Sequence, residues 1–275
     1  MKTTITSNDK SFFDLGELRA YSGLFKYLSL RDVLVRYKQT WVGFGWSLIR
    51  PLINIIIFGC LSYLVEKNGN FQDRFLFVSC GVVFWQLLST CITEVSNSLT
   101  SNSNILTKVY FPKILLPLSG LLVCLIDFVI AFVIFLTLYF FIKGVPPWQV
   151  VFLPLVIGYG LVFALAFGLF FATASVKYRD VKFILPFIIQ ILFYASPVFL
   201  SSTFFLELNL PEWLKVAYQL NPLVFILNAF KYCFYGTFDG PSINYIIASF
   251  CITVVLLYAS IRYFLNFEKS FADYI

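Results

Sequence analysis

The sequence predicts an all-α, polytopic membrane protein with six transmembrane helices. The chain of 275 residues is 60% apolar and 12% charged, whereas soluble domains carry about 25% charged residues. A membrane-spanning helix needs about 20 mostly apolar residues, because a charge at the bilayer centre costs roughly 2.5–3.5 kcal/mol on insertion scales. Six stretches without charge approach or exceed this length: 51–65, 75–93, 114–142 (interrupted by Asp127), 144–176, 183–206 and 240–261.

The distribution of Lys and Arg predicts how these helices are oriented. With a cytoplasmic N-terminus, 15 of the 20 basic residues fall in segments on the inner side of the membrane and five on the outer side. Cytoplasmic segments are enriched in Lys and Arg, so we expect both termini in the cytoplasm. The inner segments are 1–50, 94–113, 176–182 and 262–275, and the outer segments are 66–74, 143–148 and 201–239.

The first predicted element is an amphipathic helix over residues 29–41. Ser29 followed by Asp32 predicts its start as a capping box. Its charged residues lie outside an apolar arc of about 100°, so the helix either lies in the cytoplasmic membrane interface or docks on a soluble partner. The apolar arc consists of Leu30, Val33, Leu34, Tyr37 and Trp41.

By this interpretation residues 1–275 form a single membrane domain. Residues 1–46 make up the cytoplasmic and interface part, 47–262 the six-helix membrane region and 263–275 a cytoplasmic tail. The chain enters the membrane near Trp46, where an interfacial tryptophan is expected.

The segment 201–239 is too apolar for an ordinary loop, but charged residues such as Glu207 and Lys231 interrupt it. Asn221-Pro222 splits its most apolar part, because the residue before a proline is disfavoured in the helical region. The following part would be about 20 Å long as a helix, which is short of the roughly 30 Å hydrocarbon core. We therefore expect two short re-entrant helices on the outer face between the fifth and sixth spans; a seventh span is the alternative.

The sequence offers little for catalysis. It contains no histidine, which removes the commonest general base and metal ligand. It also lacks the GxxxxGK[ST], GxSxG and HExxH motifs. One carboxylate, Asp127, lies deep in a predicted span. It either couples transport to a proton or sodium ion or forms a buried hydrogen bond between helices. These features predict a chain that is not an enzyme and has no cofactor or metal site of its own.

Five groups of residues, in order from about residue 30 to the end, carry a family resemblance. They are 36–40 with Gly43, Trp46 and Pro51; 104–106 with Lys108, 111–113 and 116–117; 178–181; 194–198 with 221–222; and 271–273. Together they resemble the membrane subunits of ABC exporters for cell-surface polysaccharides, the permeases for O antigen, capsule and teichoic acid. Arg50 departs from the neutral polar residue that this family often has at its position.

The resemblance implies a permease subunit of an ATP-driven transporter that exports a lipid-linked, O-antigen-like polysaccharide across the bacterial cytoplasmic (inner) membrane. A separate ABC ATPase subunit, in two copies, would bind ATP and Mg, and a second copy of this chain would complete the pore. No nucleic-acid partner is expected. Two alternatives stay open: an exporter of drugs or small lipids with the same fold, and a membrane-embedded glycosyltransferase acting on polyprenyl-linked sugars.

Four groups of functional residues are expected on this basis. Basic residues would meet the lipid-linked head group where the substrate enters, and aromatic rings beside Gln86, Gln190 and Ser196 would line the pore, with tight helix packing as the alternative. The other groups would dock the ATPase and form an outer gate. The groups are Arg31, Arg36 and Lys38 for substrate access; Phe84, Trp85, Phe193 and Tyr194 for the pore; Asn102, Asn104, Lys108, Tyr178, Arg179 and Asp180 for docking; and Pro211, Trp213, Asn221 and Pro222 for the gate.

Overall fold

The computed structural model describes residues 21–38, 45–65, 70–106, 111–268 and 271. All regular structure within these residues is helical, which confirms the predicted all-α class. The helices are α2 (Ser22–Lys38), α3 (Gly45–Val65), α4 (Phe71–Ser101), α5 (Ser103–Leu106), α6 (Leu115–Lys143), the 3-10 helix η1 (Trp148–Phe152), α7 (Leu153–Lys177), α8 (Val181–Tyr194), α9 (Ser202–Glu207), α10 (Glu212–Leu220), α11 (Pro222–Tyr235) and α12 (Ile243–Glu268).

Four helical segments of the described chain are long and apolar enough to cross a membrane: α4, α6, η1 with α7, and α12. They coincide with four of the six uncharged stretches. The other two stretches fall on α3, whose apolar part spans Pro51–Leu64, and on the 14-residue helix α8. The chain is therefore a multi-pass membrane protein, and the number of six spans remains a prediction.

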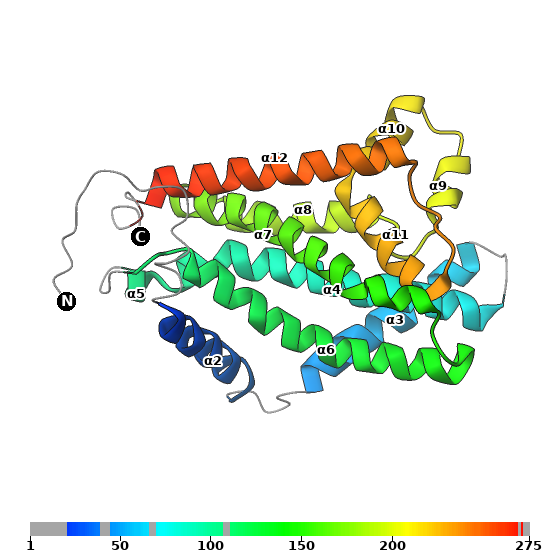
Figure 1. Ribbon diagram of the computed structural model, residues 1–275, viewed down its shortest axis with the longest axis horizontal. Helices are drawn as coiled ribbons and strands as arrows, with labels where there is room; N and C mark the ends of the chain where they lie inside the picture. Colours follow the sequence, from blue (N-terminus) through cyan, green and yellow to red (C-terminus); the bar gives the residue numbers. More distant parts are fainter. Residues whose placement is uncertain (1–20, 39–44, 66–69, 107–110, 269–270, 272–275) are drawn as a thin grey trace.

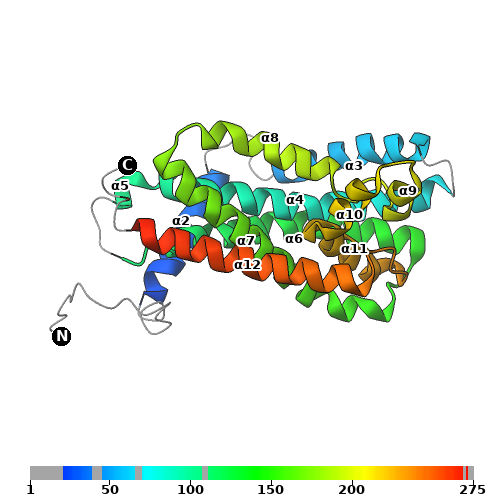
Figure 2. The same cartoon turned by 90° about the horizontal axis from the view of Figure 1, so that it is seen from above.

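The long helices run side by side along the longest axis of the molecule (Figure 1). One end of the bundle holds α5 and the turn between α7 and α8, and we name it the α5 end. The opposite end holds α9, α10 and the connection from α6 to η1, and we name it the α10 end. Viewed from above, α3 and α8 lie along one side of the bundle and α12 along the other (Figure 2).

Helix α4 is the centre of the bundle, because it packs against α3, α6, α7, α8 and α11. Most of its length from Leu76 to Leu99 is buried, which explains why its apolar residues are not confined to one face. Close approach to α7 depends on Gly168: a Cβ at this position would lie 2.7 Å from the Cβ of Val95. Small residues at such contacts let membrane helices pack backbone to backbone.

The amphipathic helix is present, but it begins earlier than predicted. Helix α2 starts at Ser22 rather than at Ser29, and the Ser29 hydroxyl donates to the carbonyl of Phe25 within the helix. Ser29 is therefore not an N-cap. The predicted residues 39–41 lie outside the described part of the chain. Helix α2 packs on α6.

The predicted inner connection 94–113 is shorter than expected. Helix α4 continues to Ser101, so residues 94–101 extend the span rather than forming a loop. Only the short helix α5 and residues 111–114 belong to the described part of the connection. A polar sequence at the end of an apolar helix is compatible with helix when its side chains bond to the preceding turn, as the Ser101 hydroxyl does to the carbonyl of Asn97 (2.8 Å).

The segment 201–239 forms three short helices, α9, α10 and α11, where two were expected. The break before Pro222 lies where the sequence predicted it. Asn221 is extended (φ −66°, ψ 119°), and its side-chain oxygen accepts from the backbone N–H of Leu223, which caps α11. That these helices re-enter the membrane remains a prediction.

Candidate functional site

A groove of about 340 Å³ lies between α3, α4 and α8, and three of the four candidate pore residues line it. The rings of Trp85 and Phe193 meet edge to face, 5.6 Å apart, and Phe193 meets Tyr194 in the same way at 5.3 Å. Trp85 is 7% exposed, whereas Tyr194 is 58% exposed. The groove therefore has a buried aromatic floor and an exposed aromatic edge.

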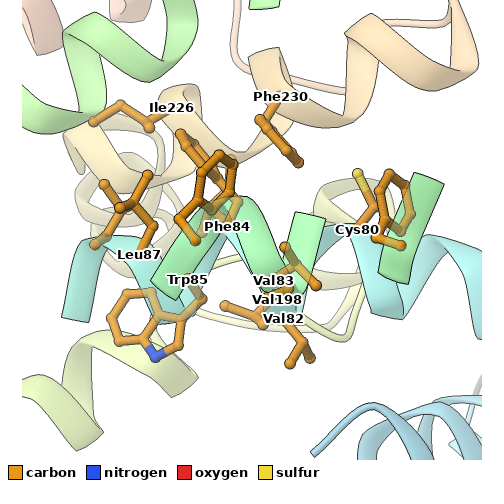
Figure 3. Close-up of a cluster of buried hydrophobic side chains, with 14 of the residues drawn as sticks. Cys80, Val82, Val83, Phe84, Trp85, Leu87, Val198, Ile226 and Phe230 are labelled. Atoms are coloured by element: carbon orange, nitrogen blue, oxygen red, sulfur yellow. The ribbon is translucent and has the colours of Figure 1, made fainter. Parts of the chain in front are cut away.

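Phe84, the fourth candidate, does not line this groove. Its side chain is fully buried, and its ring stacks on that of Phe230 with centroids 4.1 Å apart. Figure 3 shows Phe84 directed toward Ile226 and Phe230, while Trp85 points to the opposite side of α4. Successive residues of an α-helix are about 100° apart, and here this rotation directs Phe84 into the core while Trp85 faces the groove. Phe84 is a packing residue.

Polar side chains accompany the aromatic rings in the groove. The predicted neighbours Gln86 and Gln190 line it, and the side-chain oxygen of Gln86 is buried without a hydrogen-bond partner among the described residues. Ser196 does not line it, because its hydroxyl is buried and donates to the carbonyl of Leu192. Sequence reasoning missed Asn54 of α3, although it is the single amide within the apolar stretch 51–65.

A second hollow, of about 470 Å³, lies where α2 meets α4 and α6, and it contains two of the candidate residues for substrate access. Arg31 donates to Asp32 (2.6 Å) and to the side-chain oxygen of Asn102 (2.6 Å). Arg36 pairs with Glu94 and with Asp127 (2.7 Å). Lys38 is the last residue of α2, and its side chain lies outside the described part of the chain.

Arg31 and Arg36 of α2 thus face the bundle, together with the fully buried Leu28, whereas several large apolar side chains face outward. Tyr27, Leu30 and Leu34 are 65%, 59% and 51% exposed. An outer face with several exposed apolar side chains is the arrangement expected of a helix that meets lipid. Asp127, the deep carboxylate of the sequence, is one of the groups that attach α2.

The candidate docking residues lie at the α5 end. Asn104 is exposed on α5, and Tyr178, Arg179 and Asp180 are exposed in the turn between α7 and α8. Asn102 is engaged within the chain, since its amide donates to the carbonyl of Ser98. Lys108 lies outside the described residues.

The candidate gate residues lie at the α10 end and differ in their surroundings. Pro211 and Trp213, at the start of α10, are exposed, and Trp213 is 70% exposed. Asn221 and Pro222 are internal: the Asn221 amide donates to the carbonyl of Ala195 (3.2 Å), and Pro222 is buried in the first turn of α11. Pro211 and Trp213 are therefore exposed at the surface, whereas Asn221 and Pro222 determine where α11 begins.

Comparison with known proteins gives concordant results. The chain is 27% identical over 259 residues to the O-antigen export system permease protein RfbA of Myxococcus xanthus, covering 94% of this chain and 98% of that protein. It is 25% and 23% identical to two proteins of the same name from Klebsiella pneumoniae, with 84% and 91% of this chain covered and 88% and 94% of those proteins. The family model described as ABC-2 type transporter matches residues 23–235. The family predicted from the motifs is confirmed: the chain belongs to the ABC-2 type transporter family of membrane proteins.

Proposed function

We propose that this chain is the permease subunit of an ATP-driven exporter of a lipid-linked polysaccharide, and that the groove between α3, α4 and α8 is its half of the pathway. Membership of the ABC-2 family implies an ABC transporter with an ATPase partner. The relatives named as O-antigen export permeases support a polysaccharide as the substrate. The observation that carries the proposal is the composition of the groove.

Aromatic rings and amides together suit a sugar polymer. The rings of Trp85 and Tyr194 offer flat surfaces for the C–H faces of sugars, and the amides of Asn54, Gln86 and Gln190 offer donors and acceptors for hydroxyl groups. Stacking requires no fixed register, so a polymer could move along the groove. A drug-sized apolar molecule would leave the three amide side chains that line the groove without new partners.

The groove is open along one side, which supports a homodimer as the working unit. Pro186, Gln190 and Tyr194 are exposed where they border it, and the neighbouring faces of α3 and α8 expose large apolar side chains such as Ile57 and Phe187. Two copies related by a two-fold axis would place two grooves face to face and enclose a pathway.

We further propose that the α5 end lies in the cytoplasm and binds the ATPase, with both termini on that side, and that α9, α10 and α11 re-enter the membrane around the exit. The charge distribution of the sequence supports this orientation. The guanidinium groups of Arg31 and Arg36 are bonded to carboxylates, which would compete with the phosphate oxygens of an anionic head group. We therefore propose that substrate access involves a rearrangement of α2.

The test is export by variants of the groove in cells that carry the partner ATPase. Trp85→Ala and Tyr194→Ala should reduce surface polysaccharide strongly while the complex with the ATPase is recovered in normal amounts. Trp148→Ala is the matched control, because Trp148 is 69% exposed and lies outside the groove. Normal export per recovered complex in both groove variants would show that the rings only pack helices. A glycolipid identified in the purified complex would distinguish a polysaccharide exporter from a drug exporter.

A further inference from the structure

The link between α8 and α9 is irregular backbone whose carbonyl groups are bound by side chains from other helices. In a membrane such backbone persists only where protein or water satisfies its polar groups. The bonds run from the Asn221 amide to the carbonyl of Ala195 (3.2 Å), from the Lys231 ammonium to those of Pro197 (2.5 Å) and Val198 (3.3 Å), and from the Ser62 hydroxyl to that of Phe199 (2.8 Å). The link is thus held from α3 on one side and from α11 on the other.

Lys231 is the most unusual of these donors. Its residue is 3% exposed, and its ammonium lies 3.6 Å from the centroid of the Phe77 ring. Within the described part of the chain, no carboxylate forms an ion pair with it. A buried charge is costly, and here it is stabilised by two carbonyl oxygens and an aromatic face. A methionine would fill much of the same volume without this cost, but it would leave the carbonyl oxygens of Pro197 and Val198 without this donor.

The link is also pressed against α4, one turn from the groove. A Cβ at Gly81 would lie 2.1 Å from the carbonyl oxygen of Val198, so only glycine allows this approach. Figure 3 shows Val198 beside Val82 and Val83 of α4. Gly81 precedes Trp85 by one helical turn, and the link directly follows the groove residues Phe193 and Tyr194.

We propose that Lys231 is a positioning residue for the aromatic groove. Its ammonium holds the link against α4, and the link sets the end of α8 so that the rings of Phe193 and Tyr194 face Trp85. The effect of Lys231 on the geometry of the groove does not depend on what is transported. Its effect on export rests on the proposed function, and the two are measured separately.

The geometry is tested with Trp85 as a fluorescent probe, after replacement of the other four tryptophans by phenylalanine in the full-length chain. Lys231→Met should shift the emission maximum of Trp85 and change its quenching by acrylamide, because Phe193 and Tyr194 move relative to its ring. Gly81→Ala should act in the same direction, since it displaces the same carbonyl. Lys215→Met is the matched control, because Lys215 lies at the same end and pairs with Glu212.

A double-mutant cycle separates positioning from general loss of stability. Ser62→Ala removes another donor to the same link, so its effect on Trp85 should be non-additive with that of Lys231→Met and additive with that of Lys215→Met. Unchanged Trp85 emission in Lys231→Met overturns the proposal. If Lys231→Met does not fold, unchanged emission in both Gly81→Ala and Ser62→Ala overturns it. A shifted emission with normal export would retain the positioning role and instead contradict the groove as the pathway.

Discussion

At the scale of single residues, the groove and the core are separated by one position of the sequence. Trp85 and Phe84 are adjacent on α4, yet one lines the groove and the other stacks on Phe230. The close contacts of α4 are set in the same way by individual glycines. Gly168 of α7 lies against Val95, whereas at Gly158, about three turns earlier on the same helix, a Cβ would enter open space with no packing neighbour within 4 Å.

This pair of glycines gives a direct test of helix packing. Alanine is favoured over glycine in a helix by about 1 kcal/mol, so Gly158→Ala should leave the stability of the purified chain unchanged or raise it. Gly168→Ala should lower it by roughly 1–3 kcal/mol, because the added methyl group overpacks the contact with α4. Thermal unfolding in detergent measures both. Equal melting temperatures for the two variants would contradict the α4–α7 contact described here.

At the scale of elements, the attachment of α2 depends on Arg36, which bridges a carboxylate of α4 and one of α6. The three side chains are between 18% and 41% exposed, so the bridge is neither fully buried nor a surface pair. The bridge acts together with apolar packing, because Leu28 of α2 is 1% exposed and belongs to a cluster with Val95 of α4 and Leu116 of α6.

Arg36→Gln should therefore loosen α2 by about 1–2 kcal/mol, a value between those of exposed and buried ion pairs. Hydrogen exchange of the α2 amides should become at least about fivefold faster. Lys26→Gln, at an exposed position of the same helix, is the control and should have no effect. Combining Arg36→Gln with Glu94→Gln and Asp127→Asn should restore much of the protection, because neither position then holds a carboxylate without its cation. Equal exchange in Arg36→Gln and Lys26→Gln would refute this attachment.

The short helix α5 is the element best placed to receive force from an ATPase, since it connects α4 and α6 at the α5 end. A cysteine at Asn104 should form a crosslink with the ATPase in assembled complexes, and the yield should change with nucleotide. A cysteine at Asn209, between α9 and α10 at the other end, is the control and should form none. Labelling of the Asn104 position from outside intact cells would reverse the proposed orientation.

At the scale of the whole molecule, the chain is a multi-pass bundle with one open side. The exposed apolar faces of α3 and α8 border the groove, whereas α12 exposes apolar residues such as Val255 on the opposite side. A bilayer can cover both sides, but only the first carries polar groove residues that gain from being enclosed by protein.

In a chain whose exposed Cys60 and Cys251 are replaced by serine, a cysteine at Phe187 should consequently form a disulfide-linked dimer in membranes, because Phe187 is 67% exposed and adjoins the groove residue Pro186 on α8. A cysteine at Val255, which is 65% exposed on α12, serves as the control and should remain monomeric. Dimers formed equally through both positions, or through Val255 alone, would argue against a pathway enclosed by two grooves.

At the same scale, the sequence predicts that ATP is hydrolysed by a separate subunit. The sequence contains no GxxxxGK[ST] loop, so the purified chain should not hydrolyse ATP. Hydrolysis should appear when the partner ATPase is added, and the preparation without it is the control. Activity that stays with the isolated chain through further purification would contradict the division of labour between two subunits.

The sequence by itself determined the helical membrane class, the family, and the break at Asn221-Pro222, because these follow from composition, local backbone preference and motifs along the chain. Only the tertiary structure decided which way α2 turns its arginines, that Trp85 rather than Phe84 lines the groove, and that Lys231 binds the link after α8. An uncharged stretch is recognised by its cost in lipid, which depends on the residues alone. The partners of Arg36 and Lys231 come from segments 58 and 34 residues away, and such pairings arise only when the helices pack.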